Sequence, residues 1–586
     1  MLSLLALAPI ASASDESALR AEAAAHHQWH ALIHSRAGVP QIRDPEFLLS
    51  AAAFSPRAEL DASLARLKAD PGAACRFPAR ATWLSQRGLL PAVSLHHCPE
   101  VVEFRQRAPI DRVDLVFASE SITSPASMLG HIFLNISGNL AEGGRTEHAI
   151  SFFTDAETWN YPKLLFDSLV IGKRGYFALA PFETAMRQYL VEEQRTVWLV
   201  PMRFTPAQTE VFGLHLLELK HTRLTYFFQD YNCATLVHFL LSLGDRPLPD
   251  YSQWMTPKDI VRQVTDADMA GASSVVMPSR VLARLISSDA DVAGLADAVL
   301  NTRLDEWRPT ADGQGYLQWS FAQSFNRLAR EERRITADAA QRNEVALRPW
   351  AAGQFAGYAI SPDPRFDPAR APQETQWLVE AGRRGGKAGV DVTFRPVSHE
   401  LDDDNRSYVA ETEMQLLTPT LRLEEGGRAT VDRFVVYAMR SLQPHDALLG
   451  GFSARFDMRW DSQWSALAGR RAFFLVSGGA GRTWRLTPDL DFYALANVGA
   501  AARSSTSFMY GSFDAGAIVR AVWDTKLHVT VSRAYNEADS GRASTRASVA
   551  LSHYVRRDLT LRLRAGAQRQ DGRMERQASL GATWMY

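Results

Sequence analysis

The last third of the chain alternates apolar and polar residues one by one. In LTLRLRAGAQ (559–568), leucines and alanines fall on one face, and threonine, arginines, glycine and glutamine fall on the other. RQASLGATWMY (576–586) repeats this pattern after Asp571-Gly572, a pair typical of tight hairpin turns. A strict period of two is that of a β-strand. The region is therefore expected to form a sheet with one apolar and one polar face.

About twelve segments of this kind follow position 371, each close to the ~9–11 residues that cross a bilayer in a tilted strand. Arginines on the polar face suit a wet lumen, and aromatic residues gather near strand ends. The chain ends on Tyr586 at an apolar position, which resembles the terminal assembly signal of bacterial outer-membrane proteins. A soluble β-sandwich or lipocalin-like barrel shows the same alternation. With the export signal described next, the pattern favours an antiparallel transmembrane β-barrel of about twelve strands.

The N-terminus, MLSLLALAPIASASDES, has a short apolar run followed by Ala11-Ser12-Ala13. This A-x-A form is typical of signal-peptide cleavage sites and predicts a secretory signal at residues 1–13. No stretch of the sequence is long and apolar enough for a transmembrane helix. The 64 Lys and Arg residues balance the 65 Asp and Glu residues, so no overall positive charge points to a nucleic-acid partner.

The chain has three cysteines, and export into an oxidising compartment changes how they are expected to pair. Cys75 and Cys98 are close in sequence and would close a loop of about 22 residues, worth on the order of 3 kcal/mol. Cys233 would remain a free thiol. The alternative is three unpaired, buried cysteines. No C-x-x-C spacing indicates a metal site. His26, His30 and His34 can share one helix face, but no carboxylate or cysteine completes a ligand set, so we expect them to be structural.

The remaining sequence divides by its periodicity. A helical N-terminal region with the disulfide is expected at 15–105, and an α+β domain at 106–255, where strand-like segments such as RVDLVFAS and HIFLNISG alternate with long helical ones. A helical connector is expected at 256–370, and the barrel at 371–586. The chain is therefore expected to be a multi-domain protein with an α+β domain, helical flanks and a barrel.

Cys233 is the first candidate for chemistry. It stands in FFQDYNCATLVHFLL, directly after Asn232, a good helix N-cap, and before an apolar helical run. A thiol in the first turn of a helix lies at the positive end of the helix dipole, which favours the thiolate. Cys233 also shares a stripe with Leu236 and Val237, so it could be a simple core residue.

A histidine on a neighbouring strand would favour the catalytic interpretation. In SPASMLGHIFLNI, His131 is at the start of a strand, where an imidazole can face a helix terminus from the adjacent layer. Such a histidine can take the thiol proton and later protonate the leaving group. His148, Ser151 and Asn135 are candidates for the group that orients His131.

Three further residues are candidates for contacts around the reacting carbonyl. Ser127, Tyr231 and Asn232 flank the expected site and are candidates for binding substrate or an oxyanion. The backbone N–H of Cys233 at the helix start is the more natural oxyanion donor.

Together, these segments resemble the Lnb N-terminal periplasmic domain family, also called DUF4105, which is similar to a circularly permuted NlpC/P60 or papain-like fold. The resemblance rests on SPASMLGHIFLNI, on GKRGYFALAPFETAMRQYLVEEQRTVWLVPM and on YFFQDYNCATLV, and with CRFPARATWL it covers about residues 75–250. The order of His and Cys and the Asn-Cys pair also resemble lecithin:retinol acyltransferase-like enzymes. The resemblance implies Cys233 as nucleophile and His131 as general base. Characterised members with membrane helices move an acyl chain within a bacterial lipoprotein, whereas this chain is expected to carry a barrel.

We therefore expect a thiol acyltransferase or hydrolase in the bacterial outer membrane, with its catalytic domain in the periplasm. Its expected partners are outer-membrane lipid and a lipoprotein or lipid acyl substrate, and no cofactor is expected. One alternative is a cell-wall peptidase or amidase of the NlpC/P60 type, which would act on a peptidoglycan peptide. Another is a non-catalytic barrel protein whose extra domain only binds or plugs.

Overall fold

The computed structural model describes residues 13–120, 129–154, 163, 166–250, 254–287, 291–352, 354–355, 357–358, 360, 364–408, 410–466, 469–504, 506–520, 522–536 and 543–586. The predicted signal peptide therefore lies, apart from Ala13, outside the described residues. The chain divides into two compact units, Met1–Pro278 (unit 1) and Ser279–Tyr586 (unit 2). No helix in the described part of the chain is both long and apolar enough to cross a membrane.

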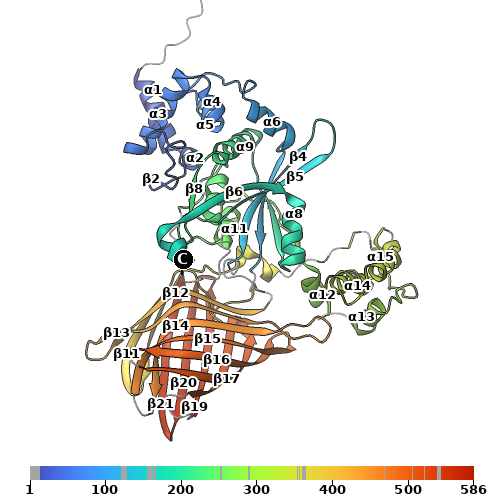
Figure 1. The fold of residues 1–586 in the computed structure, drawn as a ribbon, viewed down its shortest axis with the longest axis vertical. Helices are drawn as coiled ribbons and strands as arrows, with labels where there is room; N and C mark the ends of the chain where they lie inside the picture. The colour runs from blue at the N-terminus through green and yellow to red at the C-terminus, as the bar shows by residue number, and fades with distance from the viewer. Residues whose placement is uncertain are drawn as a thin grey trace, which may run out of the picture. The chain divides into compact units, whose positions relative to one another are not determined.

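Unit 1 begins with short helices and continues into a seven-stranded antiparallel sheet with the order β8-β6-β5-β4-β3-β7-β9 (Figure 1). The sheet strands are β3 Arg112–Ala118, β4 His131–Asn139, β5 Arg145–Thr154, β6 Lys173–Pro181, β7 Val197–Pro201, β8 Leu224–Tyr226 and β9 Ser274–Val276. A small separate hairpin is formed by β1 Ser35–Arg36 and β2 Val39–Pro40. The helices are α1 Ala13–Ala25, α2 His27–Leu32, α3 Pro56–Ala69, α4 Ala73–Arg76, α5 Pro78–Gln86, α6 Pro99–Arg107, α8 Phe182–Arg187, α9 Pro206–Lys220, α10 Cys233–Leu241 and α11 Pro257–Asp266, with π-helical turns at Asp167–Ile171 and Gln188–Glu192.

The predicted disulfide is present. It joins Cys75 in α4 to Cys98, the residue before α6, across a sequence separation of 23. Cys233 is the free cysteine. The expected start of the connector at residue 256 was wrong, because α11 and β9 belong to unit 1 and β9 pairs with β7 at the edge of the sheet.

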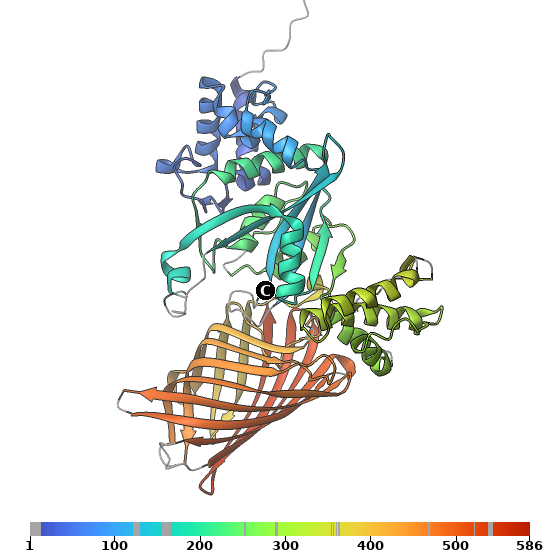
Figure 2. The same ribbon diagram turned by 45° about the vertical axis from the view of Figure 1, so that its right-hand side comes forward.

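Unit 2 contains four helices and the barrel. The helices α12 Ser279–Ser287, α13 Ala293–Leu300, α14 Gly313–Glu331 and α15 Ala337–Ala352 pack around Phe321 and Phe325, and Leu449 from a barrel loop joins their core. The barrel closes through β10 and β21, which pair from Gln376↔Met585 to Arg384↔Gln577 (Figure 2). Its strands are β10 Gln376–Arg384, β11 Lys387–Arg395, β12 Glu411–Glu424, β13 Ala429–Leu442, β14 Ser453–Ser465, β15 Gly469–Thr487, β16 Leu490–Arg503, β17 Thr506–Arg520, β18 Thr525–Asn536, β19 Ala543–Arg556, β20 Leu559–Gln570 and β21 Arg573–Met585.

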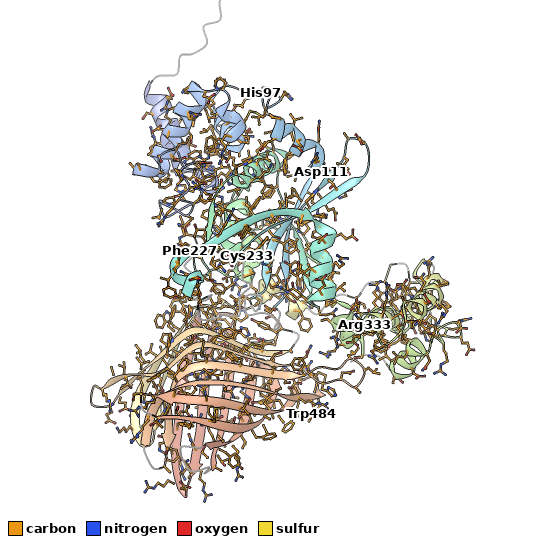
Figure 3. All side chains as sticks on the ribbon, viewed as in Figure 1. His97, Asp111, Phe227, Cys233, Arg333 and Trp484 are labelled. Atoms are coloured by element: carbon orange, nitrogen blue, oxygen red, sulfur yellow. A yellow bond between two sulfur atoms is a disulfide. The ribbon has the colours of Figure 1, made fainter. Side chains whose placement is uncertain are left out.

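The predicted alternation is confirmed, and it is inverted relative to that of a soluble protein. On the last two strands, β20 and β21, Leu580 is 64% exposed, whereas Arg562 is 1% exposed. Apolar side chains therefore point outward and charged ones into the lumen, as hydrocarbon surroundings require. Aromatic pairs lie on the outer face near strand ends, for example Trp484 with Phe492 at 5.9 Å between ring centroids (Figure 3). Such belts mark the boundary between membrane and water.

Leu563 near the middle of β20 tests the orientation of this face. Its side chain is 50% exposed on the apolar side of the barrel. We expect Leu563→Arg to lower the stability of the barrel in lipid vesicles by about 2–4 kcal/mol, because it would place a charge in hydrocarbon. The shift of the urea midpoint, followed by heat-modifiable gel mobility, measures this change. Leu563→Phe should leave the midpoint nearly unchanged, and equal midpoints for both variants would contradict the assigned lipid face.

Candidate active site

Cys233 is the first residue of α10, as the sequence predicted. Asn232 caps the helix: its side-chain oxygen accepts the backbone N–H groups of Ala234 at 2.9 Å and Thr235 at 3.0 Å. The Thr235 hydroxyl in turn accepts the N–H of Asn232 at 2.7 Å, which completes a capping box. The helix therefore begins at a fixed position, with the thiol in its first turn beside the sheet (Figure 3).

Backbone N–H groups converge on the Cys233 thiol. They belong to Ile132, to Ala234 and to Cys233 itself, and each lowers the pKa of the thiol because it stabilises the thiolate. Although the side chain is partly exposed, protein surrounds most of it, and this loss of solvation is the larger effect. It raises the pKa of Cys233 to about 11. The resting residue is therefore a thiol, contrary to what the helix dipole alone suggests.

His131 begins β4 and lies one residue before the N–H that faces the thiol. Its ring packs against two aromatic side chains, Phe133 and Tyr189, both at 6.0 Å between ring centroids. Burial, assisted by the nearby charge of Arg195, lowers the pKa of His131 to about 3, so the imidazole is neutral at physiological pH. Within the described residues, no hydrogen bond joins it to the Cys233 sulfur. Both groups are therefore uncharged at rest. His131 is the first residue of β4, and the Cys233 thiol lies next to the backbone of the second.

Arg195 is the charged group common to both residues. It precedes β7, is buried, and donates to the backbone oxygen of Ala118 at 2.8 Å and to Glu193 at 2.8 Å. Its guanidinium carbon is 5.0 Å from the centre of the Tyr189 ring. The positive charge lowers the pKa of both His131 and Cys233. Arg195 is therefore placed to stabilise negative charge on the sulfur.

His148 was expected as a possible third member of the site, but the strand register argues against it. His148 pairs with Ile136 on β4, while His131 pairs with Ala118 on β3. Side chains alternate along a strand, so positions 131 and 136 point to opposite faces of the sheet. His148 therefore lies on the other face, and its Nδ1 contacts the hydroxyl of Thr146 at 3.3 Å. It cannot orient His131.

The other two candidates share the face of His131. Asn135 lies four residues along β4, roughly 13 Å away at the rise of a strand, and its amide contacts Asp114 at 3.5 Å. Ser151 is two residues beyond Ala149, the partner of Asn135, and is therefore on the correct face of the neighbouring strand. Of the three, only Ser151 fits by face and position.

Two of the three groups expected at the oxyanion are occupied by contacts within the fold. Besides capping α10, the Asn232 amide donates to the backbone oxygens of Phe228 at 2.9 Å and Met255 at 3.1 Å. The Tyr231 ring is buried and its hydroxyl is bonded to His34 at 2.7 Å. Both side chains are therefore engaged by contacts within the fold, and their part in binding substrate stays a prediction. Ser127 lies outside the described residues.

The contact of Tyr231 begins a buried chain of hydrogen bonds. His34 is bonded to His215 at 3.0 Å, and His215 to Glu218 at 2.9 Å, both in α9. Burial lowers the pKa of His34 well below its usual value, so this ring is neutral. Glu218 accepts two backbone N–H groups, so the simplest assignment has each group donating toward it: Tyr231 to His34, His34 to His215, and His215 to Glu218.

Glu218 also links this chain to the N-terminal helices. Its carboxylate accepts the N–H groups of Ala79 at 2.9 Å and Arg80 at 3.0 Å at the start of α5. The Arg80 guanidinium donates to Glu59 in α3 at 2.9 Å, and all three charged side chains are fully buried. The N-terminal helices therefore hold the segment directly before Cys233.

Sequence reasoning missed Arg195, Tyr189 and the histidine chain. Arg195 is a single arginine before an apolar strand, and Tyr189 lies within a helical run. The capping residues could be identified because they act locally, whereas these groups act across elements. Among these residues only His34 stands out in the sequence, because it belongs to a histidine-rich helical segment. The sequence predicts a structural role for it.

Comparison with known proteins supports the division seen in the structure. Residues 100–267 match the family model of the Lnb N-terminal periplasmic domain. Residues 365–585 match a domain of unknown function, DUF7840, and residues 21–87 match another, DUF7843. None of the curated proteins matches the chain.

Solved structures similar to this chain include porins and an outer-membrane channel. The NanC porin is 15% identical over 36% of this chain and 100% of its own, with a TM-score of 0.24. An outer-membrane channel from Pseudomonas putida F1 is 9% identical over 39% and 98%, with a TM-score of 0.25. The KdgM porin is 11% identical over 36% and 99%, with a TM-score of 0.22. Residues 100–267 are thus similar to the Lnb N-terminal periplasmic domain, and they are followed by a closed twelve-stranded antiparallel β-barrel.

Proposed function

We propose that unit 1 is a cysteine acyltransferase or hydrolase that acts on lipid-linked or lipoprotein acyl groups. The observation that carries the proposal is the place of Cys233 at the capped start of α10, where backbone N–H groups of Ile132, Ala234 and Cys233 itself favour the thiolate. A nucleophile that becomes negative is stabilised by such surroundings. Arg195 adds a buried positive charge nearby.

The protonation states define the first step. Because both Cys233 and His131 are uncharged at rest, the thiol proton moves to the imidazole as sulfur attacks the ester carbonyl. The carbonyl oxygen takes the negative charge and accepts the N–H of Cys233. When the carbon–oxygen bond of the ester breaks, the imidazolium returns the proton to the departing alcohol, and an acyl-thioester remains on Cys233.

The second step releases the acyl group. An amine or water attacks the thioester carbonyl and gives a proton to His131. The carbon–sulfur bond breaks, and His131 returns the proton to the sulfur. An amine yields an amide and a water molecule yields a free acid, which distinguishes transferase from hydrolase. Association with outer-membrane lipid through the barrel would keep a lipid-borne donor available.

The acyl-thioester provides the first test. Full-length protein in detergent is mixed with phospholipid or with a diacylated lipopeptide, and Cys233 is examined by mass spectrometry for a hydroxylamine-sensitive acyl mass. We expect Cys233→Ala to abolish acylation and His131→Asn to slow it about 10²- to 10⁴-fold, the usual contribution of a general base. His148→Asn is the matched control on the opposite face and should retain the wild-type rate.

The outcomes separate the candidate functions. Acylation that depends on both Cys233 and His131 supports the proposal. If lipids leave Cys233 unmodified but peptidoglycan peptides are cleaved in a Cys233-dependent way, the site is a peptidase of the NlpC/P60 type. If neither substrate reacts, a binding domain is the better account.

The pH dependence of alkylation tests the resting state of the thiol. Cys233 is the free cysteine, so iodoacetamide reports on it alone while the disulfide is intact. With a pKa of about 11, the thiolate fraction should rise about tenfold per pH unit. We expect the alkylation rate to climb steadily from pH 7 to pH 9. A plateau reached below pH 7 would instead indicate a thiolate–imidazolium pair.

The hydrogen bond of Tyr231 tests the role of the N-terminal helices. Tyr231→Phe keeps the ring against Phe152, at 5.6 Å between centroids, but leaves the His34 nitrogen without its donor. We expect unit 1 to lose about 1–3 kcal/mol of stability, the cost of an unsatisfied buried polar group.

The measurement uses Cys233 labelling at increasing urea concentration, which reports on the opening of unit 1. We also expect a lower acylation rate at saturating substrate, because the start of α10 is less firmly held. Tyr176→Phe, at a half-exposed position on β6, is the control and should change neither quantity. Equal stability of the two variants would argue against a role of the histidine chain.

A further inference from the structure

The barrel lumen contains a cavity of about 890 Å³ whose lining is dominated by arginine. It lies at the end of the barrel where β14 turns into β15, β16 into β17 and β18 into β19, which we call the hairpin end. Strand register places most of its lining on the lumen face: Arg459 pairs with Leu475, and Gln463 with Arg471. Six arginines line the cavity, and we call this set the arginine cup: Arg455, Arg459, Arg470, Arg471, Arg503 and Arg546.

The charges of the arginine cup are only partly balanced. Arg455 pairs with Asp514 at 2.8 Å, and Arg470 pairs with Glu575. For Arg471, Arg503 and Arg546, the part of the chain that the structure describes offers no carboxylate within ion-pair distance. Arg546 donates instead to the neutral amide of Gln568 at 2.8 Å. Within the described residues, these three guanidinium groups thus line one cavity without a carboxylate partner, and their like charges favour the binding of an anion.

The opposite end of the lumen differs. There the loop between β11 and β12 folds inward, and its acids neutralise the lumen arginines. Glu400 pairs with Arg395 at 2.7 Å and with Arg564 at 2.7 Å, and Asp403 pairs with Arg562 at 2.5 Å. The loop residues Glu400 and Asp403 are buried. The loop therefore supplies counter-charges at this end of the lumen that the arginine cup lacks among the described residues.

Strand number fixes which way the arginine cup faces. With twelve strands, the chain enters at Gln376 and leaves at Met585 at the same end of the barrel, opposite the hairpin end. The domain ahead of the barrel is periplasmic, so that end faces the periplasm. The arginine cup therefore opens toward the cell exterior.

We infer that the arginine cup is a binding site for a multivalent oxyanion that arrives from outside the cell. Guanidinium groups bind phosphate and carboxylate oxygens in pairs, and three unpaired ones favour an ion with more than one negative charge. The volume is that of a small-molecule site. Hydroxyl and amide groups complete the lining, including Ser512, Ser532 and Gln570, and these suit the remaining oxygens of such a ligand. This inference is independent of the chemistry at Cys233.

Isothermal titration of the folded, full-length protein in detergent provides the test. The probes are inorganic pyrophosphate and citrate, which separate phosphate-bearing from carboxylate-bearing ligands. We expect saturable binding of at least one probe that weakens as salt is added. Binding of pyrophosphate alone identifies phosphate as the recognised group, and binding of citrate alone identifies carboxylate. If neither binds at millimolar concentration, the inference is overturned.

Matched variants locate the site. The triple variant Arg471→Gln, Arg503→Gln and Arg546→Gln should weaken binding at least tenfold. The control, Arg533→Gln, Arg569→Gln and Arg576→Gln, removes the same charge from the outward side of the strands and should bind like wild type. Heat-modifiable mobility verifies that each barrel is folded, and Arg503→Gln alone serves if the triple variant fails to fold. Equal affinity of the folded cup and control variants would overturn the assignment.

Discussion

The closure of β10 against β21 is the constraint on which the barrel depends. In hydrocarbon no water can satisfy an edge strand, so each backbone N–H and C=O must find a partner in the next strand. Once the sheet closes, one face of every strand meets lipid and the other meets the lumen. The lumen must then hold the polar side chains, and the inward loop with Glu400 and Asp403 provides counter-charges for arginines such as Arg562. Charge inside the barrel is thus a consequence of closure.

In unit 1, burial and backbone dipoles act on the pKa of Cys233 in opposite directions. The N–H groups of Ile132, Cys233 and Ala234 favour a thiolate, and burial disfavours it more strongly. The same burial keeps His131 neutral. The pair therefore differs from a preformed ion pair, and charge separation would be deferred until a substrate carbonyl is present. The N-terminal helices support this arrangement from a distance, through His34 and Tyr231.

Sequence alone predicted the features that depend on near neighbours. Alternation along β20 and β21 indicated the barrel, and Asn232 before an apolar run placed Cys233 at a helix start. The disulfide followed from spacing and compartment. What sequence alone did not show has one cause, the pairing of distant segments. His148 was excluded by the register of β4 against β5, and Tyr231 is engaged by a partner almost two hundred residues away. Arg195 gained its importance only when β7 was placed beside β3.

The raised pKa of Cys233 also affects how readily its thiol would be oxidised in the periplasm. Oxidising enzymes and small disulfides there react with thiolates far faster than with thiols. Cys75 and Cys98 are already joined, so Cys233 has no partner cysteine in the chain that could reverse a mixed disulfide. A thiol that stays protonated presents little thiolate to such oxidants. Burial of Cys233 keeps its thiol protonated, and it would therefore also help to keep this cysteine in its reduced form.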